Sequence, residues 1–296
     1  MISPTPITPY HTKAYPAIDP TRPELSSKGK SVLITGGGSG IGAEVAIAFA
    51  KSGAAHIGLV GRRANRLEQV KASIEADYPG VQVHALPADL ADGASTTAAV
   101  KAFAAAVGPG NKIDVLVANA GYLNTSVPLD DLTETDFWTS FEVNVKGAFN
   151  LLRAFGPVAA AGAVVINVSS GIAHFAYLPG YSGYHASKIA AVKLFDHFNA
   201  EHPGVRVTHL HPGVLATEMG ARAQEEGVVK LDYDDLDLPG AFTVWLASPE
   251  AAFLDGRFVW SNWDVDTLKS KAAEIAANPT LFTLVLDGFP STAIGS

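Results

Sequence analysis

The chain has 296 residues, of which 48% are hydrophobic and 17% are charged, so it can bury a substantial core. Its net charge of −8 and its lack of basic clusters argue against nucleic acid as a partner. The absence of cysteine excludes disulfides and thiolate chemistry, and no apolar run approaches the ~18 residues needed to span a bilayer. We therefore expect a cytoplasmic protein with no membrane or nucleic-acid partner.

The first 30 residues are rich in proline and lack the hydrophobic region of a secretory signal. We interpret residues 1–30 as an N-terminal arm that lies over the domain or is partly disordered. Short apolar segments then alternate with longer amphipathic stretches. The apolar segments predict strands at Ser31–Thr35, Ala55–Val60, Val81–Leu86, Ile113–Asn119, Ala163–Val168, Val205–Leu210 and Arg257–Ser261. The amphipathic stretches predict helices near Ala43–Ser52, Ala64–Asp77, Ala94–Val107, Glu134–Phe155, Ser182–Ala200 and Pro239–Ala247.

This alternation predicts an α/β fold, a Rossmann-type doubly wound parallel sheet of about seven strands with helices on both faces. Several predicted strands are apolar on both sides, as buried parallel strands are. No internal linker or repeat interrupts residues 31–262, so we expect them to form one domain. Residues 263–296 would form a C-terminal tail packed on the same domain, with a helical piece near Thr267–Ala277.

A glycine-rich turn, Thr35–Gly42, follows the first predicted strand and opens a helix. In that position Gly36 permits a tight turn, while Gly40 and Gly42 allow close approach of backbone at the helix N-terminus. Such a helix end presents unpaired N–H groups and a partial positive charge to a diphosphate. A purely structural turn would look similar, but the strand–turn–helix context favours dinucleotide binding.

The end of the second predicted strand discriminates between cofactors. An acidic residue about 20 positions beyond the glycines would accept the ribose 2′-hydroxyl of NAD. Here the strand end reads Gly61-Arg62-Arg63 and has no carboxylate. Because arginine matches phosphate oxygens in a fork geometry, we expect NADP(H) as the cofactor. The alternative is that one or both arginines are solvated residues at a helix start.

Tyr184 and Lys188 lie four residues apart, and Ser170 lies 14 residues before the tyrosine. On a helix, residues four apart share a face, so the phenol and the ammonium would lie side by side. A positive charge about 4 Å away favours phenolate and can lower the pKa of a tyrosine by up to roughly three units. Such a tyrosine could exchange a proton with a substrate oxygen near neutral pH.

Taken in order, these motifs resemble the short-chain dehydrogenase/reductase family over roughly residues 30–262. The matching segments are Thr35–Gly42, Ala88-Asp89-Leu90, Asn119-Ala120-Gly121, Val143–Gly147, Ser169-Ser170, Tyr184–Lys188 and His211-Pro212-Gly213. The segment Phe258–Asp264 is similar to that of fungal members often associated with secondary metabolism. The resemblance implies that residues 31–262 are the dinucleotide-binding and catalytic domain.

The resemblance also implies the roles of individual side chains. Tyr184 would donate or accept the proton, Lys188 would lower its pKa and hold the nicotinamide ribose, and Ser170 would hydrogen-bond the substrate oxygen. Asn144 would anchor a water that connects Lys188 to solvent. The residues expected to bind cofactor are Gly36, Ser39, Gly40, Ile41, Gly42, Arg62, Arg63, Asp89, Leu90, Asn119, Ala120, Gly121, Lys146, Tyr184, Lys188, Pro212, Gly213, Val214 and Thr217.

One spacing departs from the family pattern. The usual interval before the tyrosine would place the serine at Gly171, so Ser170 requires an extra residue in the following loop. Ser169 is the alternative. Because adjacent strand positions face opposite ways, only one of the two serines is expected to face the substrate. Tyr181 has no lysine four residues later, so we do not expect it to be the acid.

The substrate pocket is expected between residues 122–131, residues 172–181 and an insert at residues 215–238. Tyr122, Phe175, Tyr177 and Tyr181 would suit a lipophilic or aromatic body, and neither loop contains a lysine or arginine. Asp232, Asp234, Asp235 and Asp237 at the end of the insert predict a mobile, solvated lid. Alternatively, the aromatic residues pack against the core and the insert decorates the surface.

The sequence thus predicts an NADP(H)-dependent oxidoreductase acting on a carbonyl or secondary alcohol of a mostly apolar small molecule. The alternatives are a non-redox enzyme on the same fold, such as a dehydratase or isomerase, and a cofactor-binding regulatory protein without turnover. No metal is expected, because His209 and His211 lack a carboxylate or cysteine partner at metal spacing.

Apolar residues recur at helical spacing on the predicted helix Glu134–Phe155, namely Phe137, Phe141, Val145, Phe149 and Leu152. Core packing explains such a stripe first, and a subunit interface is the other interpretation. We expect a homodimer or homotetramer built partly from this helix and from Ser182–Ala200.

Overall fold

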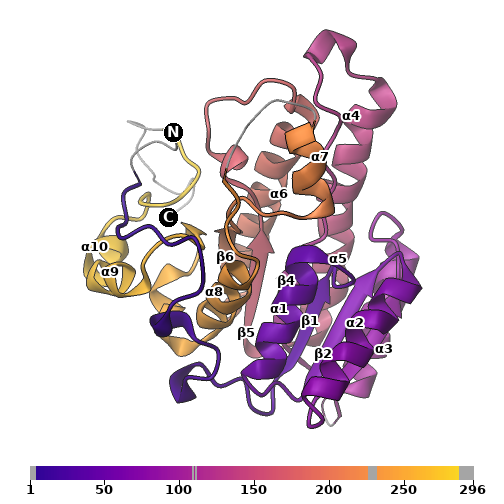
Figure 1. Cartoon of the computed structure of the whole chain (residues 1–296), viewed down its shortest axis with the longest axis vertical. Coiled ribbons are helices and arrows are strands. Elements are labelled where there is room, and N and C mark those ends of the chain that lie inside the picture. The colour runs from indigo at the N-terminus through magenta and orange to yellow at the C-terminus, as the bar shows by residue number, and fades with distance from the viewer. Residues whose placement is uncertain (1–4, 109, 111, 226–231, 287–296) are drawn as a thin grey trace.

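The computed structural model describes residues 5–108, 110, 112–225 and 232–286. Within these residues a parallel sheet of seven strands has the order β3-β2-β1-β4-β5-β6-β7 (Figure 1). The strands are β1 (Ser31–Thr35), β2 (His56–Gly61), β3 (Gln82–Pro87), β4 (Ile113–Ala118), β5 (Ala159–Val168), β6 (Arg206–His211) and β7 (Phe258–Trp260). The strand order reverses between β1 and β4, which creates a crevice at their carboxyl ends. The predicted fold class is confirmed.

Helices cover both faces of the sheet. One face carries α1 (Gly40–Lys51), α2 (Ala64–Asp77) and α8 (Asp237–Ala247). The other carries α3 (Gly93–Ala106), α5 (Gly147–Phe155) and α6 (Ser182–Glu201). Along β1, Val32 and Ile34 enter the first core and Leu33 enters the second. Successive side chains of a strand point to opposite faces, so the entirely buried β1 requires a core on each face of the sheet.

The expected helix Glu134–Phe155 contains an irregular turn. It consists of α4 (Glu134–Phe141), a π-helical turn at Glu142–Lys146, and α5. Asn144 lies in the π-helical turn and is buried. Such turns are frequent at functional sites. Apolar spacing does not reveal one extra residue in a turn, which is why the sequence predicted a regular helix.

The apolar stripe on these helices is buried only in part, so core packing, the first of its two interpretations, does not explain all of it. Leu152 is buried, but Phe149 is 48% exposed. With residues of α6 it forms an exposed apolar patch that includes Trp138, Phe141, Val145, Phe149 and Leu194. Exposed patches of this kind mark interaction surfaces more often than single exposed residues do.

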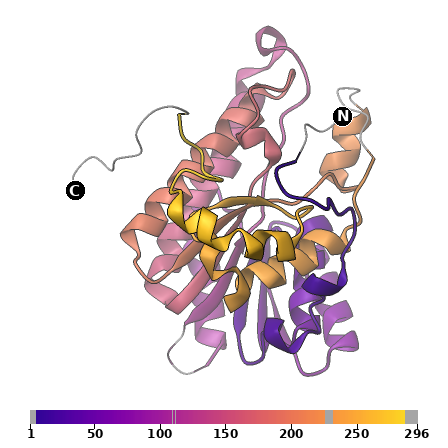
Figure 2. The same ribbon diagram turned by 90° about the vertical axis from the view of Figure 1, so that its left-hand side faces the viewer.

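The N-terminal arm packs over the domain (Figure 2). Its apolar side chains Ile7, Ile18 and Leu25 are fully buried in the same core as α8. Tyr10 forms an antiparallel bridge with Trp263, which joins the arm to the C-terminal tail. The tail continues as α9 (Val265–Ser270) and α10 (Ala272–Ala277), where the sequence predicted one helical piece. The arm and the tail therefore support the last strands of the sheet together.

The insert after β6 contains a helix that the sequence did not predict, α7 (Glu218–Glu225). Short 3-10 helices, such as Pro249–Leu254, were also not predicted, and some element ends differ: α1 begins at Gly40 inside the glycine turn, and β5 reaches back to Ala159. Among the described residues, no helix combines the length and apolarity that a membrane span requires.

Candidate active site

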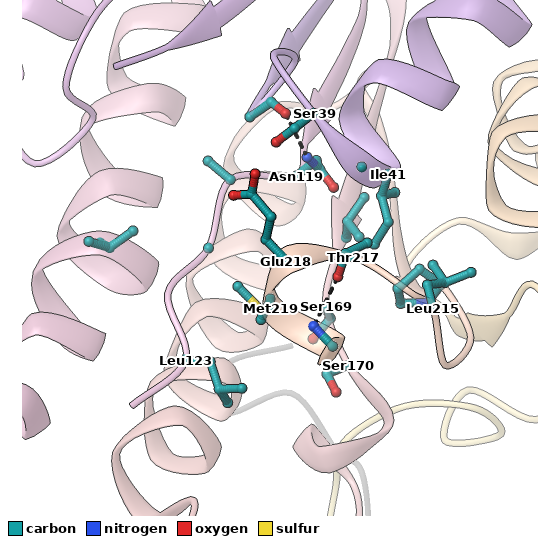
Figure 3. A pocket seen from close by; sticks show the side chains of 18 of the residues that line it. Ser39, Ile41, Asn119, Leu123, Ser169, Ser170, Leu215, Thr217, Glu218 and Met219 are labelled. Atoms are coloured by element: carbon teal, nitrogen blue, oxygen red, sulfur yellow. Dashed lines mark hydrogen bonds between the residues drawn. The ribbon is translucent and has the colours of Figure 1, made fainter. Parts of the chain in front are cut away.

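A cavity of about 890 Å³ opens at the carboxyl ends of the strands (Figure 3). Its nucleotide end is lined by the glycine turn and by the ends of β2, β3 and β4. Its substrate end is lined by residues that follow β5, by α7 and by Trp260 of β7. Tyr184 and Lys188 line the cavity as well. The crevice predicted by the strand order is therefore a continuous cleft.

The glycine turn shapes the floor of the nucleotide end. Gly36 and Gly40 adopt left-handed backbone, with φ of +67° and +52°. A Cβ at Gly42 would lie 2.3 Å from the carbonyl oxygen of Gly36, so no larger residue fits there. Ser39 makes no side-chain cap on α1, which leaves the first N–H groups of the helix available to an anion.

Hydrogen bonds join the glycine turn to the end of β4. The Thr35 hydroxyl accepts the backbone N–H groups of Asn119 and Ala120, each at 3.0 Å. The Asn119 amide donates to the Thr35 carbonyl at 2.9 Å. The expected residues Asn119, Ala120 and Gly121 line the cleft, as do Asp89 and Leu90. These bonds fix the two strands on either side of the crevice.

Positive side chains gather at the end of β2. Arg62 and Arg63 line the nucleotide end, together with Arg66 of α2, which the sequence analysis did not single out. Arg63 Nη2 donates to Ser39 Oγ at 3.1 Å, so the arginine and the glycine turn border the same space. Its other nitrogen pairs with Glu218 of α7, again at 3.1 Å.

Tyr184 and Ser170 meet at the centre of the cleft. The Ser170 hydroxyl lies close enough to the Tyr184 phenol to lower the pKa of that phenol. Burial raises the pKa of Tyr184 to about 12, and the neighbouring Ser170 hydroxyl offsets only part of this effect. The phenol is therefore protonated at neutral pH, which is the form that a proton donor requires.

Lys188 is buried beside this tyrosine. Its ammonium lies 5.5 Å from the centroid of the Tyr184 ring and donates to the Val168 carbonyl at 3.1 Å. Burial lowers the pKa of Lys188 to about 8. The net pKa of Tyr184 is raised rather than lowered, because desolvation outweighs the lowering expected from a neighbouring cation.

Asn144 does not line the cleft that Tyr184 and Lys188 line. Its amide oxygen accepts the N–H of Tyr122 at 2.7 Å, and its nitrogen donates to Ser187 Oγ at 2.9 Å. The Ser187 hydroxyl in turn donates to the backbone carbonyl of Tyr184 at 2.8 Å. Asn144 thereby links α6 to the loop after β4.

The two candidate serines differ in their partners, although both line the cavity. Ser170 lowers the pKa of the neighbouring Tyr184 and caps the following turn by accepting the N–H of Ile172 at 3.4 Å. The Ser169 hydroxyl is buried and has no hydrogen-bond partner in the described part of the chain. The geometry thus brings Ser170, rather than Ser169, to the tyrosine.

The loop after β6 borders the middle of the cleft, where Pro212, Gly213, Val214 and Thr217 all line it. The Asp234 carboxylate accepts the N–H of Val214 at 2.9 Å and the residue is 8% exposed. The prediction of a solvated residue is therefore wrong for Asp234, which holds this loop in place. Residues 226–231 of the expected lid lie outside the described residues.

The substrate end is mostly apolar. Its lining residues include Leu123, Ile172, Phe175, Leu178, Tyr181, Leu215, Met219, Tyr233 and Trp260. Of the four expected substrate residues, Phe175 and Tyr181 line it, whereas Tyr122 and Tyr177 do not. The Tyr122 hydroxyl donates to Asp136 at 2.6 Å, and Tyr177 is 75% exposed to solvent.

Sequence analysis missed the role of His211 as a cleft residue. Its Nδ1 accepts the N–H of Gly171 at 3.0 Å, directly after Ser170. Burial lowers the pKa of His211 to about 3, so the ring is neutral and keeps this acceptor. The available signal was its place before Pro212-Gly213 at the end of a strand, a matching segment in which only Pro212 and Gly213 were expected to bind cofactor.

Two expected cofactor residues lie outside the lining of the cleft. Gly42 lies beneath the turn, and Lys146 is directed to Glu142, with 2.6 Å between their charged atoms. Among the described residues, no group of three or more metal-binding side chains is placed to hold an ion.

The remaining residues fit a bound dinucleotide. Gly36 and Gly40 line the cleft without side chains, and α1 begins at Gly40, so the N-terminus of this helix lies at the cleft. The arginines after β2 add positive charge at one end. Such a cleft suits a phosphate-bearing ligand that reaches Tyr184 with its other end.

Comparisons with known proteins agree with this geometry. The family model described as short chain dehydrogenase matches residues 30–227. A short chain dehydrogenase/reductase of Claviceps purpurea (strain 20.1) is 37% identical over 288 residues, covering 96% of this chain and 94% of that protein. One from Aspergillus aculeatus is 34% identical over 284 residues, covering 95% and 96%.

A solved structure extends the comparison. The crystal structure of a short chain dehydrogenase from Burkholderia cenocepacia J2315 in complex with NADP has a TM-score of 0.70 and 30% identity. The match covers 81% of this chain and 99% of that one. Family model, relatives and fold agree, and the chain therefore belongs to the short-chain dehydrogenase/reductase family of oxidoreductases.

Proposed function

We propose that the protein is an NADP(H)-dependent oxidoreductase that transfers a hydride between the nicotinamide and a carbonyl or secondary alcohol of a mostly apolar small molecule. One observation carries the proposal: Tyr184, Ser170 and Lys188 meet where the nucleotide end of the cleft opens into its apolar substrate end. The likeness to fungal relatives supports a role in secondary metabolism.

In this reaction Tyr184 donates its phenolic proton to the substrate oxygen during reduction and accepts a proton during oxidation. Because its pKa is raised to about 12, the phenol of Tyr184 is protonated at neutral pH. Ser170 donates a hydrogen bond to the same oxygen as negative charge develops on it. A bound nicotinamide supplies or accepts the hydride.

Lys188 and Asn144 support the proton transfer. The ammonium, 5.5 Å from the ring of Tyr184, favours the phenolate that remains after the proton has left. Asn144 fixes the backbone of Tyr184 through Ser187 and anchors a water that returns the proton from solvent by way of Lys188.

The preference for NADP(H) follows from charge at the end of β2. Arg62 and Arg63 line the cleft there, and Arg63 contacts Ser39 of the glycine turn. A guanidinium pair of this kind suits a 2′-phosphate better than a hydroxyl. The Burkholderia relative, whose structure contains NADP, supports the same choice.

The substrate is a fairly large, mostly apolar ketone or secondary alcohol. The substrate end offers Phe175, Tyr181 and Trp260 as aromatic walls. Among the described lining residues, Lys188 is the only lysine or arginine outside the nucleotide end, so a second anionic group on the substrate would find no cation there.

A homodimer or homotetramer forms through the apolar patch on α4, α5 and α6. Trp138 is 53% exposed there and Phe149 is 48% exposed. Burying these aromatic side chains against a second copy removes a large apolar area from water. Light scattering at micromolar protein should show an oligomer, and a monomer would contradict this part of the proposal.

The function is tested by mixing the protein with NADPH and a panel of bulky neutral ketones. Loss of NADPH absorbance matched mole for mole by alcohol product supports an oxidoreductase. A product formed without net loss of NADPH would indicate a dehydratase or isomerase. Cofactor binding without any product across the panel would favour a regulatory protein.

A further inference from the structure

We infer that the Glu218 carboxylate competes with the 2′-phosphate of NADP(H) for the arginines at the nucleotide end. Glu218 would then tune the preference between phosphorylated and unphosphorylated cofactor. The inference rests on the proposed NADP(H) dependence. It concerns the first turn of α7, a helix that no sequence motif indicated.

The contacts of Glu218 resemble those expected of a bound phosphate. One carboxylate oxygen lies 3.1 Å from Arg63 Nη1, and the other lies 3.6 Å from Arg66 Nη2. The second nitrogen of Arg63 donates to Ser39 Oγ at 3.1 Å. A single anionic group thus meets two guanidinium groups beside the glycine turn. All four of these residues line the cleft.

Figure 3 shows the Glu218 side chain pointing toward the glycine turn that carries Ser39. The preceding residue, Thr217, lies against the same turn. A Cβ added at Gly40 would be only 3.0 Å from the Thr217 methyl group. The start of α7 therefore lies directly against the cofactor-binding backbone. A carboxylate and a phosphate cannot both accept hydrogen bonds from the same guanidinium N–H groups, and their like charges repel each other.

Stabilisation of α7 is the alternative role for this carboxylate, because an acidic side chain favours a helix N-terminus. However, α7 has other contacts that do not depend on Glu218. Arg222 donates to the Leu123 carbonyl and lies 6.0 Å from the centroid of the Tyr122 ring. Thr217 Oγ accepts the N–H of Gly220 at 3.0 Å, which closes the first turn of the helix. Replacing Glu218 should therefore leave the helix in place.

The competition is weak, because both partners are largely solvent-exposed: 52% for the Arg63 side chain and 65% for that of Glu218. Exposed ion pairs contribute little and are screened by salt. Glu218→Gln should therefore tighten NADPH by about two- to tenfold. NADH has no 2′-phosphate and should bind the variant as it binds the wild type. At high salt the gain for NADPH should shrink.

Dissociation constants for NADPH and NADH are measured by fluorescence titration of the wild type, Glu218→Gln and Glu225→Gln. The last variant removes the same charge at the other end of α7, away from the arginine pair. A second pair of probes, adenosine 2′,5′-bisphosphate and AMP, repeats the comparison without the nicotinamide. Tightening of only the 2′-phosphorylated ligand of each pair, and only in Glu218→Gln, supports the inference.

Two independent ratios keep this inference separate from the proposed function. The wild-type ratio of NADH to NADPH affinity tests the proposed cofactor, and equal values would contradict that proposal. The ratio of variant to wild type for each ligand tests Glu218. Unchanged or weaker NADPH binding in Glu218→Gln, or an equal gain for both cofactors, would overturn the inference while leaving the cofactor preference standing.

Discussion

The two ends of the cleft are built in different ways. The nucleotide end is built mainly from backbone: left-handed glycines, the open N-terminus of α1, and the N–H groups after β4, which donate to the Thr35 hydroxyl. The substrate end uses side chains from distant segments, such as Leu123, Phe175 and Trp260. Backbone geometry suits one constant ligand, whereas a wall of exchangeable side chains can be fitted to a particular substrate.

The junction between the two ends should show the largest effect. Tyr184→Phe removes the proton donor while leaving the ring, so turnover should fall by at least about 100-fold. Cofactor affinity should be nearly unchanged, because the nucleotide end is intact. Steady-state kinetics and a cofactor titration measure the two quantities. Normal turnover in this variant would remove Tyr184 from its proposed role.

Substitutions of Ser170 and Ser169 test the same junction between the two ends of the cleft. Ser170→Ala removes a hydrogen bond to the reacting oxygen and should reduce kcat by about 100-fold. Ser169→Ala is the matched control, because the Ser169 hydroxyl is buried and faces no partner among the described residues. Its kcat should change far less. A reversed ranking would assign the substrate contact to Ser169.

The nucleotide end is probed by Arg62→Ala. Losing a charge-assisted hydrogen bond should weaken NADPH binding by on the order of 1.5–3 kcal/mol. NADH should be little affected, since it lacks the 2′-phosphate. Isothermal titration with both cofactors decides the matter. An equal loss for both would show that Arg62 does not contact the phosphate.

Lys188 links function to stability. Burial lowers its pKa from 10.5 to about 8, so between these values the unfolded chain holds a proton that the folded chain has released. This group therefore reduces stability fully below pH 8, and the penalty disappears as pH rises toward 10.5. Lys188→Met should raise the free energy of unfolding by on the order of 1–3 kcal/mol at pH 7.

Denaturant melts of Lys188→Met and of the wild type at pH 7 and pH 10 test this effect. The variant should lose activity at both values and gain stability mainly at pH 7. A variant that is less stable than the wild type at pH 7 would mean that the bond from Lys188 to Val168 outweighs the desolvation of the lysine.

The smallest effect is expected from the wall of the substrate end. Phe175→Ala removes one aromatic wall of the pocket. It should lower kcat/KM for bulky aryl ketones by about tenfold or less, with little change for small ketones. Comparing matched ketones also tests the substrate class. Small charged keto acids that outperform bulky neutral ketones in kcat/KM would contradict it.

The nucleotide end was predictable because its chemistry lies in short runs of sequence. Thr35–Gly42 and Gly61-Arg62-Arg63 follow strands whose apolar pattern is plain, so both motif and context were available. Tyr184 and Lys188 share one helix, and their side-by-side placement was also predictable. Their pKa values were not, because burial depends on the surrounding fold.

The substrate end was less predictable because tertiary contacts decide which side chains reach it. Tyr122 and Phe175 are both aromatic loop residues, yet Tyr122 is directed to Asp136 while Phe175 lines the cavity. Asp234 looked like solvated charge within an acidic run, but it is buried against the backbone of Val214. Neither outcome has a local signal in the sequence.

The most direct test of the central claim is to follow the hydride itself. NADPH carrying deuterium at the transferable position of the nicotinamide is incubated with the protein and a bulky neutral ketone that it consumes. The account predicts an alcohol with deuterium on the carbinol carbon, one for each NADPH oxidised, and almost none from Tyr184→Phe. Product without deuterium, or formed without oxidation of NADPH, would contradict it.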